Sequence, residues 1–464
     1  MASTVDIPRV VIAGPSSGVG KTTVTVGLCR ALRARGLAVA VFKCGPDYLD
    51  PTYHQRAAGR VSHNLDGWMM GREAALATFT RASAGADVAV IEGVMGLFDG
   101  ASPTGEEGST AEMAKWLAAP VLLVVDASGM ARSIAALASG FDSFDPELRV
   151  AGVIANRAGS RGHVELLAKA LRASAAGPQL VGGLARESAL VFPERHLGLR
   201  TADRAAVPES VFDAWGGLVA EAINLDTLLA LARGAPPVPT VDAPGSVSAA
   251  PPRCRIGYAL DDAFHFYYED NLRRLQALGA QLVPFSPVGD AKLPDVDGLY
   301  LGGGYPEAHA AALAANRSMR EAVAGFAAAG KPIYAECGGL MYLANAIQDL
   351  EGRSHAMVGI VPGTAVMSER LEALGYVEVE TQMASPLGPA GLRFRGHQFR
   401  YSRLEGADAA AGAYTVRRRR GGDVQREGYR AGSVLGSYVH AHWASNPLVA
   451  EGFVARCAAR EGSR

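Results

Sequence analysis

A glycine-rich stretch near the start of the sequence has residue types suited to holding the phosphates of a nucleotide. Residues 14–23 read Gly-Pro-Ser-Ser-Gly-Val-Gly-Lys-Thr-Thr and lie between an apolar run and a helix-like segment. Glycines let backbone N–H groups converge on phosphate oxygens, the following helix adds its positive N-terminus, and a lysine reaches the outer phosphates. The residues predicted to bind the nucleotide are Gly18, Gly20, Lys21, Thr22 and Thr23, and Thr22 is also a predicted Mg²⁺ ligand.

Acidic residues follow two other apolar runs of the same region. Asp47 and Asp50 come after residues 37–42, and Glu92 and Asp99 come after residues 87–91. A magnesium–nucleotide site takes oxygen ligands from the C-terminal ends of strands that neighbour the phosphate loop. We therefore expect these carboxylates to lie beside Lys21 and Thr22.

A polar pair after a later apolar run is a candidate for contact with the base. Asn156 and Arg157 follow the run VAGVIA, and either a base contact or a simple turn fits this position. Asp126, which ends the run PVLLVVD, is a weaker candidate for a strand-end carboxylate of the magnesium–nucleotide site.

The second half of the chain contains a cysteine in the pattern of a nucleophile elbow. KPIYAE, an expected strand, runs straight into Cys337-Gly338-Gly339 and then into a helix-like segment. Glycines permit the tight turn, and a thiolate near a helix N-terminus is a good nucleophile. Cys337 is therefore a candidate catalytic residue.

The same half supplies partners for this nucleophile. His440 is the best candidate base, and His442 lies on the same face if the segment is a strand. The backbone N–H groups of Gly303 and Gly304, at the end of another expected strand, could stabilise an oxyanion. Two histidines at this spacing also suggest a metal, but no further ligand cluster supports that interpretation.

Composition limits the classes of protein that fit. The 464 residues carry 45 Lys+Arg against 46 Asp+Glu, so neither nucleic acid nor a membrane surface is an expected partner. No apolar run approaches the length of a membrane span, and the N-terminus lacks a signal-peptide pattern, which favours the cytoplasm. The five cysteines lie far apart and form no C-x-x-C pair, so the sequence indicates neither a disulfide framework nor a zinc site.

The elements that must position these residues follow an α/β pattern. Continuous Val/Ile/Leu runs alternate with helix-like segments in both halves, as a parallel sheet covered on both faces requires. Later segments such as 375–383 alternate more strictly, which predicts antiparallel additions to the second sheet. Residues 233–253 are rich in Pro, Ala, Gly and Ser, so we predict domains at 1–232 and 254–464 joined by this linker.

Taken together, the sequence resembles the cobyrinic or hydrogenobyrinic acid a,c-diamide synthase family. The segments that carry the resemblance occur in order over nearly the whole chain: GPSSGVGKTT, KCGPDYLDP, EGVMGLFDG, DDAFHFYYEDNL, LYLGGGYPE, AECGGLMYL, RGHQFRYS and SYVHAH. The resemblance implies a P-loop NTPase domain similar to dethiobiotin synthetase, followed by a class I glutamine amidotransferase domain. It also implies a glutamine-hydrolysing ligase that uses ATP to amidate the a and c acetates of a corrin ring in cobalamin synthesis.

Residue roles follow from that resemblance. Thr22, Asp47 and Glu92 would position Mg²⁺, while Asp50 and Asp99 would place the substrate carboxylate or its phosphorylated form. Cys337 would attack glutamine, with His440 as its proton partner. A homodimer is the family-based expectation. Arginines near a matched segment are candidates for contact with the ring: Arg395, Arg400 and Arg403.

The sequence departs from related patterns at four positions. Pro15 stands at the usual first glycine of the loop, and Ser16 replaces the lysine that marks MinD-like partition ATPases. His442 occupies the place of the triad glutamate that many amidotransferases have, although the corrinoid branch is known for a Cys–His pair. Gln398 stands where glutamate is expected, so no acidic role is assigned there.

Other functions also fit parts of the pattern. A nickel-sirohydrochlorin a,c-diamide synthase shares the family, and cobyric acid synthase shares both domain types but is disfavoured by the intact GVGKTT loop. Cytidine triphosphate synthase pairs similar domains without the corrinoid-type segments. The non-enzyme alternative is a MinD-like switch with an inactive amidotransferase domain, against which Ser16, Cys337 and His440 argue.

Overall fold

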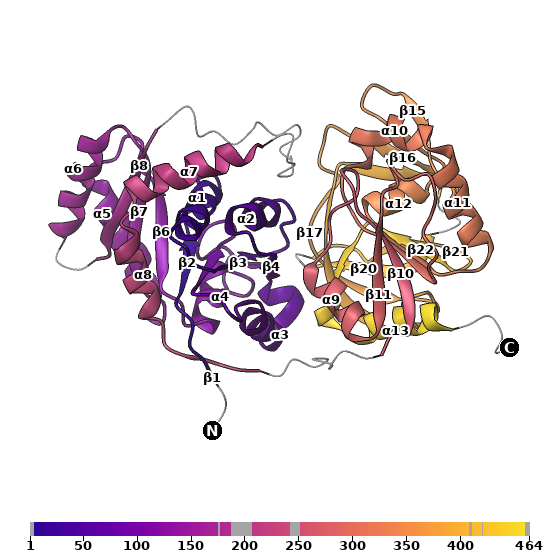
Figure 1. Cartoon of the computed structure of the whole chain (residues 1–464), viewed down its shortest axis with the longest axis horizontal. Helices are drawn as coiled ribbons and strands as arrows, with labels where there is room; N and C mark the ends of the chain where they lie inside the picture. Colours follow the sequence, from indigo (N-terminus) through magenta and orange to yellow (C-terminus); the bar gives the residue numbers. More distant parts are fainter. Residues whose placement is uncertain are drawn as a thin grey trace. The chain divides into compact units, whose positions relative to one another are not determined.

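The chain forms two compact units, Met1–Ala243 and Pro244–Arg464, each with its own sheet (Figure 1). The computed structural model describes residues 4–174, 177–186, 207–241, 251–407, 411–419 and 421–459. No helix among these residues is long and apolar enough to cross a membrane.

The described part of the first unit contains a seven-stranded sheet in which every pair of neighbours is parallel. From edge to edge the strands are β4 (Ser62–Leu65), β3 (Val39–Cys44), β5 (Val88–Glu92), β2 (Arg9–Ala13), β6 (Val121–Asp126), β7 (Val150–Ala158) and β8 (Gln179–Ala185). The phosphate loop follows the central strand β2.

Helices cover both faces of this sheet because its strands are apolar on both sides. Val11 and Ala13 of β2 belong to one buried cluster, and Val10 and Ile12 belong to the other. The first cluster includes side chains of α3 (Gly67–Ala82), α4 (Thr110–Trp116), α5 (Ser133–Phe144) and α6 (Arg161–Arg172). The second includes side chains of α1 (Lys21–Ala34), α2 (Asp50–Ala58), α7 (Glu209–Ala222) and α8 (Leu225–Arg233).

Part of the expected linker belongs to the first unit. The short strand β9 (Val238–Pro239) pairs antiparallel with β1 (Thr4–Val5), and Val238 is buried in the core. The buried guanidinium of Arg9 also donates a hydrogen bond to the Pro236 carbonyl. Residues 233–241 are thus held in place by pairing and burial that their composition does not reveal, and residues 242–250 lie outside the described residues.

The described part of the second unit contains a ten-stranded mixed sheet. Its parallel part runs in the order β11 (Ala280–Phe285), β10 (Cys254–Ala259), β12 (Gly298–Leu301), β13 (Ile333–Glu336) and β22 (Val434–Ser437). Its antiparallel part continues with β21 (Gln425–Ala431), β20 (Ala411–Arg418), β17 (Ala373–Thr381), β18 (Arg393–Arg400) and β23 (His440–His442). The predicted antiparallel additions and the α/β class are both confirmed.

Smaller elements complete the second unit. A four-stranded sheet joins β15 (Ser354–Ala356), β14 (Ala346–Gln348), β16 (Thr364–Met367) and β19 (Ser402–Glu405). The helices are α9 (Glu269–Ala277), α10 (Ala310–Ala315), α11 (Arg317–Ala328), α12 (Gly338–Leu343) and α13 (Leu448–Ala458), with short 3₁₀ turns η3 (Pro306–His309) and η4 (Trp443–Ser445).

Candidate functional site

The phosphate loop has the conformation that its glycines predict. Gly18 and Gly20 have φ values of 80° and 97°, and Gly20 caps the start of α1. A Cβ at Gly20 would lie 2.1 Å from Nδ2 of Asn156, so no larger residue fits there without displacing that side chain. Thr23 is half-buried in the first turn of α1.

The Lys21 ammonium group is held by two backbone carbonyl groups. Its Nζ donates to the Ser16 carbonyl at 2.9 Å and to the Met95 carbonyl at 2.6 Å. Burial lowers the pKa of Lys21 to about 8, and the nearby Lys43 ammonium acts in the same direction. A bound phosphate would therefore stabilise the charged form of Lys21.

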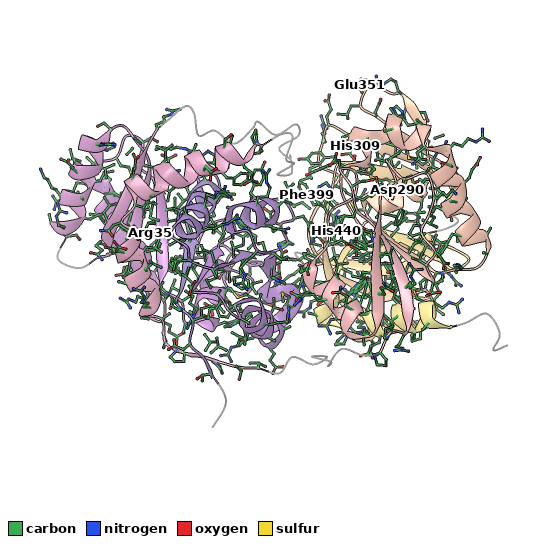
Figure 2. The ribbon with its side chains drawn as sticks, in the orientation of Figure 1. Arg35, Asp290, His309, Glu351, Phe399 and His440 are labelled. Atoms are coloured by element: carbon green, nitrogen blue, oxygen red, sulfur yellow. The ribbon has the colours of Figure 1, made fainter. Side chains whose placement is uncertain are left out.

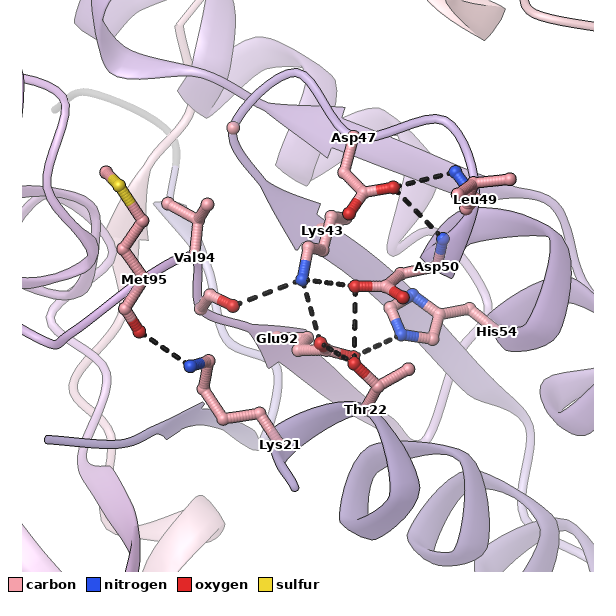
Figure 3. A network of polar contacts seen from close by, with 12 residues as sticks. Lys21, Thr22, Lys43, Asp47, Leu49, Asp50, His54, Glu92, Val94 and Met95 are labelled. Atoms are coloured by element: carbon pink, nitrogen blue, oxygen red, sulfur yellow. Dashed lines mark hydrogen bonds and ion pairs between the residues drawn. The ribbon is translucent and has the colours of Figure 1, made fainter. Parts of the chain in front are cut away.

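Beside this loop, buried charges form one connected network at the ends of β3 and β5 (Figure 3). Thr22 Oγ1 donates to Glu92 Oε1 at 2.7 Å and to Asp50 Oδ2 at 3.3 Å. Lys43 Nζ lies 2.6 Å from Asp50 Oδ2 and 2.8 Å from Glu92 Oε1. His54 Nε2 lies 2.5 Å from the other oxygen of Glu92. The structure thus places the carboxylates of Glu92 and Asp50 against Thr22, as the sequence predicted.

The protonation of the two carboxyl groups in this network differs. Burial would raise the pKa of Glu92, but Lys43 and His54 outweigh it and hold that pKa below its usual range. Burial and the neighbouring Asp47 raise the pKa of Asp50 to about 7, although Lys43 opposes the shift. Glu92 is therefore the firmly ionised carboxylate of the pair.

Asp47 and Asp99, the other two predicted acids, bind backbone N–H groups. Asp47 Oδ1 accepts from the N–H of Leu49 at 2.7 Å and of Asp50 at 3.2 Å, which shapes the start of α2. Asp99 Oδ2 accepts from the Gly96 N–H at 2.9 Å, and the charge of Asp99 acts on Lys21. Asp50 is thus the acid that contacts Thr22 and Lys43, both of which also contact Glu92. The metal role of Asp47 stays a prediction.

Asn156 lies against the phosphate loop. Its Nδ2 donates to the Val19 carbonyl at 2.8 Å, while the next residue, Arg157, pairs with Asp126 at 2.6 Å. The contact makes Asn156 a positioning residue for the loop, and the base contact stays a prediction.

In the second unit, Cys337 occupies a strained turn between β13 and α12. Its φ of 47° and ψ of −101° are unusual for a residue other than glycine. A Cβ at Gly339 would lie 2.3 Å from the Leu301 carbonyl oxygen, and one at Gly338 would lie 3.1 Å from the Gly304 nitrogen. The two glycines therefore let the elbow pack against the end of β12 and the glycine loop.

The glycine loop and His440 lie together at this elbow (Figure 2 labels His440). A Cβ at Gly303 would lie 2.5 Å from Cε1 of His440, and one at Gly304 would lie 2.1 Å from the Ala263 carbonyl oxygen. The Cys337 N–H donates to the Ser437 carbonyl at 2.7 Å, three residues before His440. The structure thus brings together all the residues predicted for this second site.

Both groups of the predicted catalytic pair are neutral in the free protein. Burial raises the pKa of Cys337 to about 12 and lowers the pKa of His440 to about 3. Burial thus outweighs the stabilisation that a helix N-terminus gives a thiolate, which agrees with the expectation that Cys337 needs a base. The thiol proton must therefore move during the reaction.

Three residues around His440 were missed by the sequence analysis. The ring of His397 stacks on that of His440, with centroids 5.0 Å apart and an interplanar angle of 20°. The Tyr268 hydroxyl lies 3.0 Å from Nδ1 of His397. Buried Glu336, which precedes the nucleophile, accepts from the Ala441 N–H at 3.1 Å. All three lie in segments that carry the family resemblance, but no local pattern links any of them to His440.

His442 stands where many amidotransferases have a triad carboxylate, but its contacts are with Tyr268 and Ala444. Its ring centroid lies 4.7 Å from that of Tyr268, and its Nδ1 accepts from the Ala444 N–H at 3.4 Å. Among the residues that the structure describes, its buried Nε2 has no hydrogen-bond partner.

The three candidate arginines have different surroundings. Arg395 lies 3.6 Å from Glu378, and Arg403 pairs with Glu405 at 2.7 Å. The guanidinium carbon of Arg400 lies 4.4 Å from the ring centroid of Tyr438, and its charge acts on Cys337. Arg400 is therefore a residue of the cysteine site.

Comparisons with known proteins agree with the two sites. Residues 10–199 match a family model described as the CobQ/CobB/MinD/ParA nucleotide binding domain, and residues 255–448 match the CobB/CobQ-like glutamine amidotransferase domain. These matches confirm the predicted classes of the two domains.

Curated relatives match over nearly their full length. A protein of Leptospira interrogans (serovar copenhageni) named cobyrinate a,c-diamide synthase is 51% identical over 98% of this chain and 99% of its own. Relatives with the same name are 51% identical in Syntrophotalea carbinolica and 44% identical in Dehalococcoides mccartyi strain CBDB1, each over 97% of this chain and 98% of theirs. The strand-end carboxylates, the cysteine elbow and this identity lead to one conclusion: the chain belongs to the cobyrinate a,c-diamide synthase family.

Proposed function

We propose that the protein uses ATP and glutamine to amidate the a and c acetate carboxylates of cobyrinate or its metal-free counterpart, hydrogenobyrinate, in cobalamin biosynthesis. The observation that carries this proposal is the presence, in one chain, of a phosphate loop beside buried carboxylates and a strained cysteine elbow beside His440. Ligation of ammonia to a carboxylate requires activation by a nucleotide, and glutamine requires a nucleophile to release that ammonia. The proposal includes a cytoplasmic location, which rests on the sequence alone, and a homodimer, which rests on the family resemblance alone.

The first unit would activate the carboxylate. A carboxylate oxygen of the ring attacks the γ-phosphorus of ATP, ADP leaves, and an acyl phosphate forms. Ammonia then attacks the acyl carbon, and phosphate leaves with its bonding electron pair. Lys21 and the loop N–H groups would hold the phosphates, while Asp50 and Asp99 would place the acetate or its phosphorylated form.

The donor set beside the loop fits Mg²⁺. Thr22 and Glu92 bring a hydroxyl and a carboxylate together, and Mg²⁺ is commonly bound by one or two carboxylates plus substrate phosphates. Among the described residues no group of three or more His, Cys, Asp or Glu side chains is placed to hold a metal, so the phosphates would supply the remaining ligands. The ion would neutralise phosphate charge, and Asp47 is the further predicted ligand.

The second unit would release ammonia. The Cys337 sulfur attacks the amide carbon of glutamine, and His440 accepts the thiol proton and returns it to the departing nitrogen. The N–H groups of Gly303 and Gly304 would stabilise the oxyanion. Water then hydrolyses the thioester to glutamate.

The proposal is tested by mass spectrometry of the product formed with ATP, Mg²⁺ and glutamine. Cobyrinic acid, hydrogenobyrinic acid and nickel-sirohydrochlorin are offered separately, and two amidations of either corrin acid are expected. If only nickel-sirohydrochlorin were amidated, it would be the substrate in place of the corrin acids. The absence of any ATP or glutamine turnover would instead favour a nucleotide switch.

Two variants test the division of labour. Cys337→Ala should abolish glutamine-driven synthesis and retain synthesis from ammonium salts, because only the first step of glutamine attack is removed. Lys21→Ala should abolish both, because the triphosphate loses its main positive contact. Loss of ammonium-driven synthesis in the Cys337 variant would contradict two separable sites.

A further inference from the structure

Two oppositely charged residues lie beside the cysteine elbow. Glu307 follows Pro306, whose Cδ would lie 2.9 Å from a Cβ at Gly338. Arg400 stacks over Tyr438, the residue after the Ser437 carbonyl that accepts the Cys337 N–H. Burial raises the pKa of Cys337, the Glu307 carboxylate adds to that rise, and the Arg400 guanidinium opposes it. Glu307 lies in η3, three residues beyond Gly304, and Arg400 is the last residue of β18. Two separate segments thus bring one negative and one positive group to the nucleophile.

The Glu307 carboxyl lacks a cationic partner in the part of the chain that the structure describes. The residue is half-buried, and no lysine, arginine or histidine among the described residues pairs with it. Burial raises its pKa to about 7, although a hydrogen bond from its own backbone opposes the shift. A desolvated carboxylate is unfavourable unless a cation or hydrogen-bond donors compensate for the lost water. A ligand that carries an ammonium group would supply that compensation.

The Arg400 guanidinium lacks an anionic ion-pair partner among the described residues. Its guanidinium stacks over the ring of Tyr438 and donates to the Ser402 carbonyl, and no described carboxylate forms an ion pair with it. Its Nε is buried and has no hydrogen-bond partner among the described residues. An arginine with unused donors beside an aromatic ring is suited to binding a carboxylate.

The chemistry of glutamine matches both groups. Its α-ammonium and α-carboxylate share one carbon, which lies three C–C bonds, or about 4 Å, from the amide carbon. Residues that bind this end must therefore lie near the nucleophile, as Glu307 does beside Pro306 and Arg400 does over Tyr438. We propose that Glu307 binds the α-ammonium group and Arg400 binds the α-carboxylate of glutamine while the amide reaches Cys337.

This inference rests on the proposed glutamine hydrolysis and names the residues that select glutamine. The test uses the full chain and three amides: glutamine, glutaramate, which lacks the α-amino group, and 4-aminobutanamide, which lacks the α-carboxylate. Glu307→Gln should raise the KM for glutamine about 100-fold yet leave glutaramate hydrolysis at the wild-type rate. Arg400→Met should do the same for glutamine and leave 4-aminobutanamide unaffected, and Arg400→Lys should recover part of the loss.

The controls separate this inference from the function itself. Synthesis from ammonium salts should be unchanged in both variants, and the exposed α13 substitutions Glu451→Gln and Arg456→Met should change nothing. Equal losses on all three amides, or a fall in kcat with KM unchanged, would overturn the assignment. Failure of the wild-type protein to hydrolyse any glutamine would instead overturn the proposed function.

Discussion

The backbone of Cys337 is held where a side chain is disfavoured, with a φ of 47° and a ψ of −101°. Such conformations cost of order 1–3 kcal/mol and persist only where the surroundings impose them. Here the Ser437 carbonyl accepts the Cys337 N–H, and two glycines follow. The strained backbone at Cys337 therefore costs stability, and it holds the sulfur beside the glycine loop.

A pair of substitutions at this residue measures the strain. Glycine normally destabilises relative to alanine, but at a positive φ the order should reverse. We expect Cys337→Gly to be more stable than Cys337→Ala by about 1 kcal/mol in urea unfolding. The usual order, with alanine the more stable, would show that the turn relaxes and holds no strain.

A second residue-scale prediction concerns Gly303. A Cβ there would lie 2.5 Å from Cε1 of His440, so Gly303→Ala should push the imidazole out of place. Glutaminase kcat/KM should fall about 100-fold or more, while synthesis from ammonium salts persists. The control is Gly325→Ala on α11, where the added methyl group meets open space and glutaminase activity should be unchanged. If Gly303→Ala kept its glutaminase activity, the position of His440 would not matter for glutamine hydrolysis.

At the scale of elements, β13 ends in a buried carboxyl that ties the nucleophile strand to β23. Glu336 accepts from the hydroxyls of Tyr334 at 2.8 Å and Tyr300 at 3.1 Å, and from the Ala441 N–H. Burial raises the pKa of Glu336 to about 7, although these donors oppose the shift. The strand that leads to Cys337 and the strand that carries His440 are thus joined by one buried carboxyl group.

This acid gives a pH dependence with a defined sign. Above about pH 4.5 the unfolded chain ionises this carboxyl, whereas the folded chain keeps the proton up to about pH 7. The stability that Glu336 contributes is full below pH 4.5 and declines as the pH rises to 7. Glu336→Gln cannot ionise, so its stability relative to wild type should increase between pH 4.5 and 7.5, by up to about 3 kcal/mol.

Hydrogen exchange of the β13 and β22 amides measures that difference at each pH. The exposed Glu451→Gln substitution on α13 is the matched control and should show no such trend. A constant difference between Glu336→Gln and wild type would mean that the carboxyl is ionised throughout this range.

The sequence predicted elements better than the contacts between them. Strand ends, loops and antiparallel segments follow from local patterns, and these patterns correctly placed Glu92 and Cys337 at strand ends and Thr22 at the start of a helix. Contacts such as His54 with Glu92 join residues far apart in the chain, which no local periodicity encodes. For the same reason the preference of Thr22 for Asp50 over Asp47 emerged only in three dimensions.

For the whole molecule, separate cores imply separate unfolding. The buried apolar clusters of the first unit share no residue with those of the second. We expect two calorimetric transitions, and a non-hydrolysable ATP analogue with Mg²⁺ should raise only one of them. At 100 times its Kd the analogue would add about 2.7 kcal/mol to that unit. Lys21→Ala should remove the shift, and one merged transition that moves as a whole would contradict independent units.

The pairing of β1 with β9 joins residues 4–5 to residues 238–239, and therefore the two ends of the first unit. Every residue that this closure needs is synthesised before the strands of the second sheet. The nucleotide unit can thus finish folding during translation, while its amidotransferase partner is still being synthesised. Slowed elongation once residue 239 has emerged from the ribosome would then favour its yield, whereas a deletion of residues 4 and 5 would leave β9 without its partner strand.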